Sequence, residues 1–366
     1  MSYERESIRR MEGYRYGEQP DDPEVVKLNT NENPYPPSPA VATALGAFDA
    51  AALRRYPPAK SDAFCRVAAS QLGLTTGEVV VTHGGDEALR LAFTTFVDPG
   101  AVFSMADPSY SLYPVLARVQ DCRIESIPLA EDWSLPADFS ARVNRVGARL
   151  TCIVNPHAPS GVLLGVDTLA RIVGEIEGVV LVDEAYVDFV NPALGHDVTP
   201  LIREFDNLLL LRTLSKGYSL AGLRFGFLLG NPNLLEPIAT KTRDSYNQDL
   251  LAQTLACAAY ADGTYARRTW QRIRDARDLL LQGLVELGFR APPSQANFLL
   301  AVPPADWAIG AHSIYEQLRA RRILVRHFDT PRLGGMLRIT VGTPEQNSLL
   351  LDALREIGKG DHAAQE

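Results

Sequence analysis

Apolar runs alternate with segments of helical periodicity through roughly residues 60–230 of the chain. The helical segments include 86–97 and 167–177, where apolar positions recur every three or four residues. Most of the runs are apolar at nearly every position, which is typical of strands buried on both faces. Strands separated by helices predict an α/β fold with a mostly parallel sheet covered on both faces. We expect the strands at 78–82, 101–105, 122–127, 149–154, 178–183, 207–212 and 224–229.

The pattern changes on either side of this region. Residues 1–40 are rich in proline and asparagine, which favours an extended arm. A long amphipathic stretch from about 250 to 288 carries arginines on what we expect to be a solvated face. The chain therefore divides into an N-terminal arm (1–40), a large domain (41–250), an interdomain helix (251–288) and a smaller α/β C-terminal domain (289–366).

The C-terminal domain shows a shorter series of the same signals. Thr343 precedes a proline at the first helical position and a capping glutamine, so the last helix is expected to begin there. The tail from Gly358 to Glu366 is expected to be disordered. The other expected elements are a strand at 296–302, a helix at 311–321, and strands at 322–326 and 336–341.

Length, charge and cysteine usage narrow the class of protein. A chain of 366 residues exceeds what one core usually supports, so two domains are expected. A net charge of −8 argues against nucleic acid and membrane partners, and no run approaches the ~18 apolar residues of a membrane span. The first ten residues lack the apolar core of a signal peptide. The scattered cysteines are expected to be buried thiols of a cytoplasmic protein: Cys65, Cys122, Cys152 and Cys257.

Lys216 follows an apolar run that predicts a buried strand. Ser215 beside it and Arg224 further on are both able to hold a phosphate. A lysine that is desolvated beside cationic neighbours loses proton affinity and becomes an amine nucleophile. A surface lysine in a turn is the plain alternative, and the surrounding residues argue against it. The segment therefore predicts Schiff-base chemistry.

Asp183 comes directly after four apolar residues, so its carboxylate is expected at the C-terminal end of a buried strand. Open α/β sheets bind their ligands at that edge. Pyridoxal phosphate requires a carboxylate against its ring nitrogen, because the protonated ring is the electron sink of the reaction. Tyr186 is placed to bond the ring hydroxyl. A turn or helix cap is the alternative role for Asp183 taken alone.

A third motif combines a strand, a glycine turn and the start of a helix at residues 79–89. The free N–H groups of such a helix start bind phosphate, helped by the helix dipole. The sequence follows neither the dinucleotide-binding nor the nucleoside-triphosphate pattern of glycines. His83 and Asp86 have no further ligands near them in sequence, so no metal site is expected.

These motifs carry a resemblance to a known family. Asp183-Glu184-Ala185-Tyr186 and Ser215-Lys216 are similar to the motifs of the fold-type I pyridoxal-phosphate aminotransferases. Asn31-Glu32-Asn33-Pro34 and the segment 337–343 narrow the resemblance to the histidinol-phosphate aminotransferase branch and its close relatives. The matching stretches run in order from residue 14 to residue 347, so the resemblance covers nearly the whole chain.

The resemblance implies a fold-type I transferase that holds pyridoxal 5'-phosphate covalently through Lys216, which also moves the substrate's Cα proton. Asp183 would pair with the ring nitrogen and Tyr186 with the ring oxygen. The resemblance also implies a homodimer with shared active sites. Other cofactor contacts fall on Gly85, Asp86, Tyr110, Asn155, Ser215 and Arg224, with Tyr56 reaching in from the neighbouring subunit. Substrate contacts fall on Tyr14, Asn33, Arg326 and Arg338.

One departure from the family pattern concerns the ring oxygen. The asparagine that usually assists Tyr186 falls on Ala158, which has no polar group. Either Tyr186 bonds the ring oxygen alone, or Asn155, His157 or a water molecule contributes. Loss of one such bond would weaken the cofactor contact by about 0.5–1.5 kcal/mol without abolishing the chemistry.

Two arginines bear on the substrate class. Arg326 ends one predicted strand and Arg338 lies in the next, so both can be aimed at one anion. A phosphate ester offers more acceptor oxygens than a carboxylate. The resemblance thus implies amino transfer between histidinol phosphate and 2-oxoglutarate, which becomes glutamate. An aromatic amino-acid aminotransferase or a phospho-amino-acid decarboxylase on the same scaffold remains open, whereas a DNA-binding regulator would need a basic module that is absent from this sequence.

Overall fold

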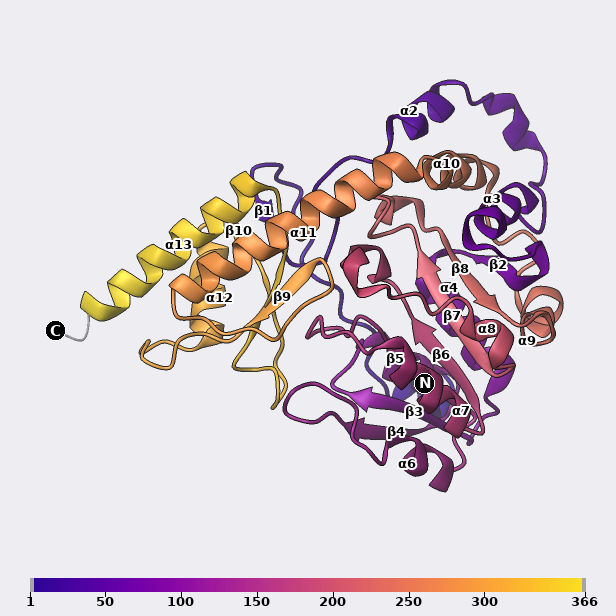
Figure 1. The fold of residues 1–366 in the computed structure, drawn as a ribbon, viewed down its shortest axis with the longest axis horizontal. Coiled ribbons are helices and arrows are strands. Elements are labelled where there is room, and N and C mark those ends of the chain that lie inside the picture. The colour runs from indigo at the N-terminus through magenta and orange to yellow at the C-terminus, as the bar shows by residue number, and fades with distance from the viewer. Residues whose placement is uncertain (1–2, 364–366) are drawn as a thin grey trace.

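The computed structural model describes residues 3–363, which form two lobes spanned by one long helix (Figure 1). The larger lobe contains a seven-stranded sheet with the order β2-β8-β7-β6-β5-β3-β4. The seven strands expected from the sequence are present in it, close to the expected ranges. They are β2 (Val79–Thr82), β3 (Val102–Asp107), β4 (Arg123–Pro128), β5 (Leu150–Val154), β6 (Val179–Asp183), β7 (Leu208–Thr213) and β8 (Gly226–Gly230).

Strand β8 runs against its neighbours in this sheet. It pairs antiparallel with both β2 and β7, whereas the pairs among β3, β4, β5, β6 and β7 are parallel. Parallel neighbours need a crossover connection, usually a helix. Residues 214–225 join β7 to β8 with a single short 3-10 turn, so the chain folds straight back. The prediction of a mostly parallel sheet is confirmed, and its exception is the connection that carries Lys216.

Helices cover both faces of the sheet because side chains alternate between two apolar cores. Along β7, Leu209 and Leu211 belong to one core, and Leu208 and Leu210 belong to the other. The first core includes side chains of α4 (Gly84–Phe96) and α5 (Leu112–Val119), and the second those of α3 (Asp62–Leu72) and α7 (Val166–Glu175). A fully buried leucine contributes about 1.5–3 kcal/mol, so β7 is firmly held just before Lys216. Shorter helices of this lobe are α6 (Phe139–Arg145), α8 (Leu201–Glu204) and α9 (Pro232–Pro237).

The stretch expected as one interdomain helix is divided in two. Helix α10 (Leu250–Ala261) packs against α2 (Pro39–Gly46) and α3, and α11 (Gly263–Glu286) runs from the larger lobe to the smaller (Figure 1). Asp262 separates them, because its side chain accepts a hydrogen bond from the Tyr265 backbone N–H and caps α11. The capping aspartate and the following Gly263 thus start a new helix inside one continuous amphipathic pattern.

The smaller lobe holds a three-stranded antiparallel sheet with the order β11-β12-β9. Its strands are β9 (Phe298–Ala301), β11 (Arg326–His327) and β12 (Leu337–Thr340), and helices α12 (Ala311–Ala320) and α13 (Pro344–Ala363) complete the lobe. The expected strand at 322–326 is split between two sheets, because β10 (Ile323–Leu324) pairs in parallel with β1 (Val26–Lys27) of the arm. The split brings Arg326 opposite Arg338 in the antiparallel register.

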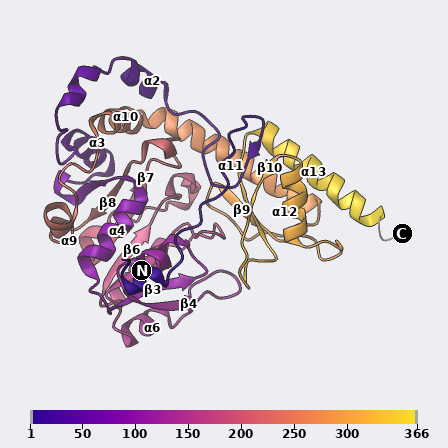
Figure 2. The ribbon, with the colours of Figure 1, turned by 180° about the vertical axis from the view of Figure 1, so that it is seen from behind.

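The extended conformation expected of the N-terminal arm is present, whereas the disorder expected of the C-terminal tail is not present in residues 358–363. After the short helix α1 (Glu6–Arg9), the arm is extended, reaches β10 in the smaller lobe and returns to α2, as Figure 2 shows. The C-terminal tail does not follow the expectation of disorder, since α13 continues through Gly358 to Ala363. Gly358 packs on Trp307, where a Cβ atom would lie 2.6 Å from the ring. Residues 364–366 lie outside the described part of the chain.

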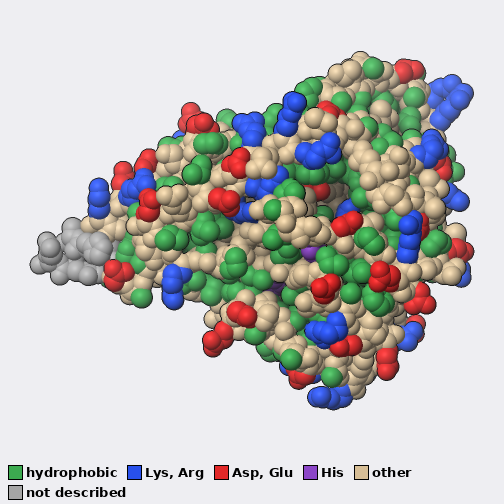
Figure 3. Space-filling view, viewed as in Figure 1, with side chains coloured by type: hydrophobic (Ala, Val, Ile, Leu, Met, Phe, Trp, Pro, Cys, Tyr) green, Lys and Arg blue, Asp and Glu red, His purple; other side chains and the backbone are tan. Residues whose placement is uncertain are grey.

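The surface and the cysteines complete this description. Lys or Arg and Asp or Glu side chains are interspersed over the face shown in Figure 3. Within residues 3–363, no helix is both long enough and apolar enough to cross a bilayer. The four cysteines are free thiols, and the expected burial holds for Cys65 and Cys152, whereas Cys122 and Cys257 are only partly buried.

Candidate active site

The predicted residues converge on one edge of the large sheet. Thr82 at the end of β2, Gly226 at the start of β8 and Thr213 at the end of β7 are register partners. Helix α4 therefore begins at the same edge from which the connection with Lys216 emerges. Asp183 ends the next strand, β6, at this edge. Strand ends alone thus bring together the three motifs that lie far apart in the sequence.

Lys216 is partly buried, and its ammonium group faces the arm. Its Nζ donates a hydrogen bond to the backbone carbonyl of Thr30 at 2.8 Å. Burial, and after it the guanidinium of Arg338, lowers the pKa of Lys216 to about 8. Near neutral pH more of this amine is therefore uncharged than in an ordinary lysine, so it is able to act as a nucleophile or a base.

The backbone around Lys216 is held from two sides. Asn33 Nδ2, in the arm, donates to the carbonyls of Lys216 at 3.2 Å and Gly217 at 3.4 Å. Trp270 Nε1, in α11, donates to the Gly217 carbonyl at 2.7 Å. The substrate contact expected of Asn33 stays a prediction, because its amide lies on the lysine's own backbone here. No sequence pattern marks Trp270, which is one aromatic residue on an amphipathic helix.

Asp183 is buried, with only 4% of its surface exposed. Tyr113 Oη donates a hydrogen bond to Oδ2 at 2.8 Å, and the Ala185 backbone N–H donates to Oδ1 at 3.1 Å. Burial raises the pKa of Asp183 to about 6 although both hydrogen bonds act to lower it. Such a carboxylate is ready to pair with a cation brought into the site. Tyr113 was not anticipated, and its position three residues after Tyr110 is the signal that could have found it.

Tyr186 is buried in the same pocket, beneath the arm. Asn31 Nδ2 donates a hydrogen bond to its Oη at 3.0 Å. Burial raises the pKa of the Tyr186 hydroxyl, so the phenol keeps its proton. Asn31 belongs to the matched arm motif, yet the sequence does not indicate that it reaches Tyr186, which is far along the chain.

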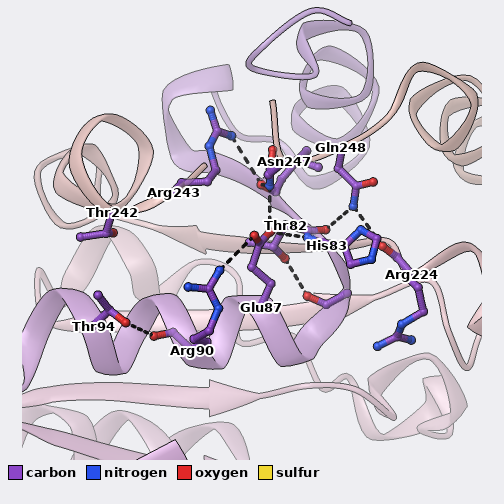
Figure 4. Close-up of polar contacts among 12 residues, drawn as sticks. Thr82, His83, Glu87, Arg90, Thr94, Arg224, Thr242, Arg243, Asn247 and Gln248 are labelled. Atoms are coloured by element: carbon purple, nitrogen blue, oxygen red, sulfur yellow. Dashed lines mark hydrogen bonds and ion pairs between the residues drawn. The ribbon is translucent and has the colours of Figure 1, made fainter. Parts of the chain in front are cut away.

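The start of α4 and Arg224 form a cradle for an anion. Gly84 has a φ of +74°, and a Cβ atom there would lie 2.9 Å from Arg224 Nη2. Arg224 Nη2 donates to Asp86 Oδ2 at 3.0 Å. Gln248 Nε2 donates to the carbonyls of Thr82 at 2.7 Å and Arg224 at 3.0 Å, which ties the two sides together (Figure 4). Free helix N–H groups beside a guanidinium are suited to a phosphate.

Ser215 and Gly85 extend this cradle toward β7. Thr213 Oγ1 donates to Ser215 Oγ at 2.9 Å and accepts from the Ser215 backbone N–H at 3.1 Å. A Cβ atom at Gly85 would lie 3.3 Å from the Leu211 side chain, so the first turn of α4 packs closely on the strand. These contacts place the Ser215 hydroxyl next to Lys216 and at the same edge as Arg224.

Two tyrosines, Tyr14 and Tyr110, contact each other beside the start of α4. Tyr14 of the arm meets Tyr110 edge to face, with ring centroids 6.0 Å apart. Tyr110 Oη donates to Asp86 Oδ1 at 3.4 Å, so the Tyr110 ring lies next to the start of α4. The structure therefore brings both expected aromatic residues next to Asp86 at the start of α4.

Arg326 and Arg338 lie opposite each other in strands β11 and β12. Both guanidinium groups also lie over the ring of Phe328, at 5.5 Å and 5.4 Å from its centroid. Arg338 donates to the Asn29 carbonyl at 3.0 Å, and its Nε is buried without a hydrogen-bond partner. Burial lowers the pKa of Arg338, and Arg326 adds to this effect. Two cations held side by side, one of them with an unused donor, are suited to a substrate anion.

The loop at residues 155–161, which departs from the family pattern at Ala158, uses its polar side chains in hydrogen bonds with Leu164, Ser160 and Pro108. Asn155 Nδ2 donates to the Leu164 carbonyl at 3.2 Å, and its Oδ1 accepts from the Leu164 N–H at 2.8 Å. His157 Nδ1 lies 2.7 Å from Ser160 Oγ, and its Nε2 lies 2.9 Å from the carbonyl oxygen of Pro108. Burial lowers the pKa of His157 to about 4, so its ring is neutral. The cofactor contact expected of Asn155 thus stays a prediction that its present bonds do not support.

Tyr56 lies on the surface rather than in the pocket of its own chain. It is 80% exposed and stacks on Tyr246, which is 49% exposed, with ring centroids 4.5 Å apart.

The described residues contain no group of three His, Cys, Asp or Glu side chains that could hold a metal ion.

Comparison with known proteins adds to this geometry. The model of the family "aminotransferase class I and II" matches residues 23–354. Histidinol-phosphate aminotransferase 1 of Trichormus variabilis is 40% identical over 357 residues, which is 97% of this chain and 99% of that protein. The histidinol-phosphate aminotransferase of Geotalea uraniireducens is 40% identical over 356 residues, with the same two shares.

A likeness to solved structures concerns the fold alone. The histidinol-phosphate aminotransferase of Sinorhizobium meliloti, solved in complex with pyridoxal-5'-phosphate, superposes with a TM-score of 0.88 at 22% identity. The match covers 98% of both chains. The histidinol-phosphate aminotransferase of Clostridium acetobutylicum superposes with a TM-score of 0.83 at 20% identity over 91% of this chain and 99% of that one.

Proposed function

Since the chain belongs to the class I and II aminotransferases, we propose that it transfers the amino group of histidinol phosphate to 2-oxoglutarate. The reaction yields imidazole-acetol phosphate and glutamate and serves histidine biosynthesis. Relatives of that name at 40% identity over 97% of the chain support this reaction. The structural observation that carries it is the pair of Arg326 and Arg338 side by side in adjacent strands, with Arg338 close enough to Lys216 to lower its pKa.

The described residues fit pyridoxal 5'-phosphate. The cradle at Gly84 has room that a Cβ atom would fill, with Arg224 on its far side, as the phosphate requires. Asp183 is a buried carboxyl in need of a cationic partner, which the ring nitrogen provides. We assign the phosphate to Gly85, Asp86, Ser215 and Arg224, the ring face to Tyr110, and the ring oxygen to Tyr186.

Lys216 and Asp183 divide the chemistry between them. When bound, the cofactor supplies an electron-withdrawing ring that stabilises the charge left on the substrate Cα. Lys216 would take the proton from Cα and deliver it to the cofactor, since its lowered pKa leaves part of the amine neutral near physiological pH. Asp183 stays ionised opposite the ring nitrogen, because an adjacent positive charge offsets the effect of burial.

Arg326 and Arg338 orient the substrate by its anionic end. A phosphate dianion can accept hydrogen bonds from two guanidinium groups, whereas one α-carboxylate fills a single group. The same pair also accepts the second carboxylate of glutamate in the return half of the reaction. Tyr14 covers this end of the pocket from the arm, next to Tyr110.

A second candidate is an aromatic amino-acid aminotransferase. The aromatic ring of Phe328 next to both guanidinium groups favours it, because aromatic substrate side chains pack well near other aromatic rings. A phospho-amino-acid decarboxylase would use the same anion site. The two candidates differ from the main proposal in what the arginines bind, so substrate comparison separates them.

We infer a cytoplasmic homodimer in which Tyr56 completes the partner's site. An 80% exposed tyrosine stacked on a second exposed ring fits a surface that another copy of the chain covers. Free thiols at Cys65, Cys122, Cys152 and Cys257 fit a reducing compartment.

The direct test is reduction of the holoenzyme with borohydride followed by peptide mapping. We expect one labelled lysine, Lys216, and glutamate formation from histidinol phosphate and 2-oxoglutarate before reduction. Lys27 is the matched control, since its Nζ also bonds Thr30, through Oγ1 at 2.7 Å. Lys27→Ala should leave the label on Lys216, and a Lys216→Ala protein with wild-type turnover would refute the assignment.

A further inference from the structure

Tyr186 receives a directed hydrogen bond from Asn31 that the reaction as described does not use. Asn31 Nδ2 lies 3.0 Å from Tyr186 Oη, and both side chains are buried. An amide nitrogen can only donate, so Tyr186 Oη is the acceptor in this contact. The phenolic hydrogen of Tyr186 is consequently left to be donated to something else in the pocket.

Thr340 contacts both the backbone and the side-chain amide of Asn31. Thr340 Oγ1 accepts from the Asn31 backbone N–H at 3.0 Å and donates its own hydrogen to Asn31 Oδ1 at 3.1 Å. Because the amide oxygen is engaged by a donor, the NH₂ group is the end that faces Tyr186. In the structure the hydrogen bonds run in one direction, from the Thr340 hydroxyl to the Asn31 amide and from that amide to the Tyr186 hydroxyl.

Asn31 is also held rigidly through its backbone. Its φ of 55° is left-handed, a conformation that asparagine and glycine tolerate better than other residues. Its carbonyl accepts a hydrogen bond from Asn297 Nδ2 at 3.0 Å, and only 1% of the residue is exposed. A polar side chain this constrained is in place before any ligand arrives.

The other groups considered for the ring oxygen are occupied or absent. Asn155 is bonded through both ends of its amide to Leu164, and His157 is bonded to Ser160 and Pro108. Ala158 has no polar group. Among the described residues of this loop, none therefore offers the second contact that the sequence left open.

We propose that Asn31 is a positioning residue, which sets Tyr186 as the hydrogen-bond donor to the ring oxygen of the bound cofactor. The inference rests on the proposed function, since it needs pyridoxal phosphate in the pocket. Asn31 does not touch the reacting atoms and acts only through the direction of the Tyr186 hydroxyl. In this way the arm compensates for the alanine at position 158.

The test is a pH titration of the cofactor's visible absorption in four holoenzymes: wild type, Asn31→Gly, Tyr186→Phe and the double variant. A bond donated to the ring oxygen withdraws electrons and lowers the proton affinity of the nitrogen that links the cofactor to Lys216. Losing the bond should therefore raise the titration midpoint, by roughly 0.5–1 pH unit for Asn31→Gly. Glycine tolerates the left-handed φ, so the backbone is kept.

The double variant separates positioning from mere support of the arm. If Asn31 acts through Tyr186, the double variant should titrate like Tyr186→Phe alone. Additive shifts, or an unchanged midpoint in Asn31→Gly, would overturn the proposal. A wild-type protein without a cofactor band on Lys216 would instead refute the proposed function.

Two further variants keep the proposal testable if Asn31→Gly does not fold. Thr340→Val removes the hydroxyl that orients the amide and should give a smaller shift of the same sign, which disappears in the Tyr186→Phe background. Asn31→Asp keeps the shape and tolerates the φ but accepts where Asn31 donates, so it should shift the midpoint further than glycine does. Rescue of the wild-type midpoint by aspartate would show a structural role and contradict the proposal.

Discussion

At the scale of single residues, burial sets the charges of the site in opposite directions. Burial raises the pKa of Asp183 to about 6 and lowers that of Lys216 to about 8, so each group is less charged than it would be in water. Bound pyridoxal phosphate would place its protonated ring nitrogen against Asp183. Its aldehyde would react with the neutral amine of Lys216. The two shifts thus prepare the pocket for one ligand.

We predict that Asp183→Asn lowers kcat by well over tenfold while the protein stays folded. A neutral amide no longer holds the ring nitrogen protonated, which removes several kcal/mol of transition-state stabilisation. Asp86→Asn is the matched control, because the same chemical change there should mainly weaken cofactor binding. Excess cofactor should then restore the activity of that variant. A loss below about tenfold for Asp183→Asn, ~1.4 kcal/mol, would mean that another acid pairs with the ring.

Sequence alone identified the residues whose chemistry is unusual for their surroundings. Asp183 and Lys216 are polar residues at the ends of apolar runs, and that contrast is visible without a structure. Tyr113 and Asn31 carry no such contrast, because their importance comes from the atoms that the fold brings to them, Asp183 Oδ2 and Tyr186 Oη. Partners that lie 70 and 155 residues away are set by tertiary packing, which periodicity does not report.

At the scale of elements, the site depends on close backbone contact between β8 and α4. A Cβ atom at Gly226 would lie 2.7 Å from the Gly84 carbonyl carbon and 3.0 Å from the Gly85 nitrogen. The neighbouring strand end and helix start are thus packed backbone to backbone at the expected phosphate site.

We predict that Gly226→Ala reduces cofactor affinity at least tenfold, because the added methyl group pushes the start of α4 away from the sheet. Gly178→Ala is the control, since a Cβ there would meet the Ala148 carbonyl oxygen at 2.3 Å outside the site. Both changes should destabilise the fold by about 1–3 kcal/mol. Equal cofactor dissociation constants for the two folded variants, measured by absorbance titration of the apoprotein, would contradict the prediction.

Strands were easier to predict than the breaks between elements. The buried strands of the large sheet have apolar cores that fix them locally, whereas the division of the 250–288 stretch depends on the cap at Asp262. The split of the 322–326 strand depends on β1, which comes from the other end of the chain. The helical tail depends on Gly358 packing against Trp307. The last two misses therefore trace to partners that are distant in sequence, whereas the helix break has a local cause, the Asp262 cap.

At the scale of the whole molecule, the pocket is assembled from the large lobe, the smaller lobe and the arm. Lys216 of the large lobe donates a hydrogen bond to the Thr30 carbonyl of the arm. Arg338 of the smaller lobe donates one to the Asn29 carbonyl of the arm. The exposed pair of Tyr56 and Tyr246 remains outside this assembly in a single chain. In the homodimer that we propose, a second copy of the chain would cover that pair and extend the site across two subunits.

We predict that mixing Tyr56→Phe and Lys216→Ala protomers restores activity above that of either variant alone. In the mixed dimer, one site receives Lys216 from the first protomer and Tyr56 from the second, so it is intact. The control is the homodimer that carries both changes, which should stay inactive after the same unfolding and remixing. Fully active monomers, detected by sizing chromatography with an in-line assay, would exclude a shared site.

The central claim is that Arg326 and Arg338 together bind the phosphate of the substrate. A comparison of substrates tests this claim most directly. The measurement is kcat/KM for histidinol phosphate and for phenylalanine in the wild type, Arg326→Gln and Arg338→Gln. We expect Arg338→Gln to impair both substrates. Arg326→Gln should impair histidinol phosphate more than phenylalanine, by roughly the 1.5–3 kcal/mol of a charged hydrogen bond. Equal losses on the two substrates in Arg326→Gln would contradict the account and favour an aromatic aminotransferase.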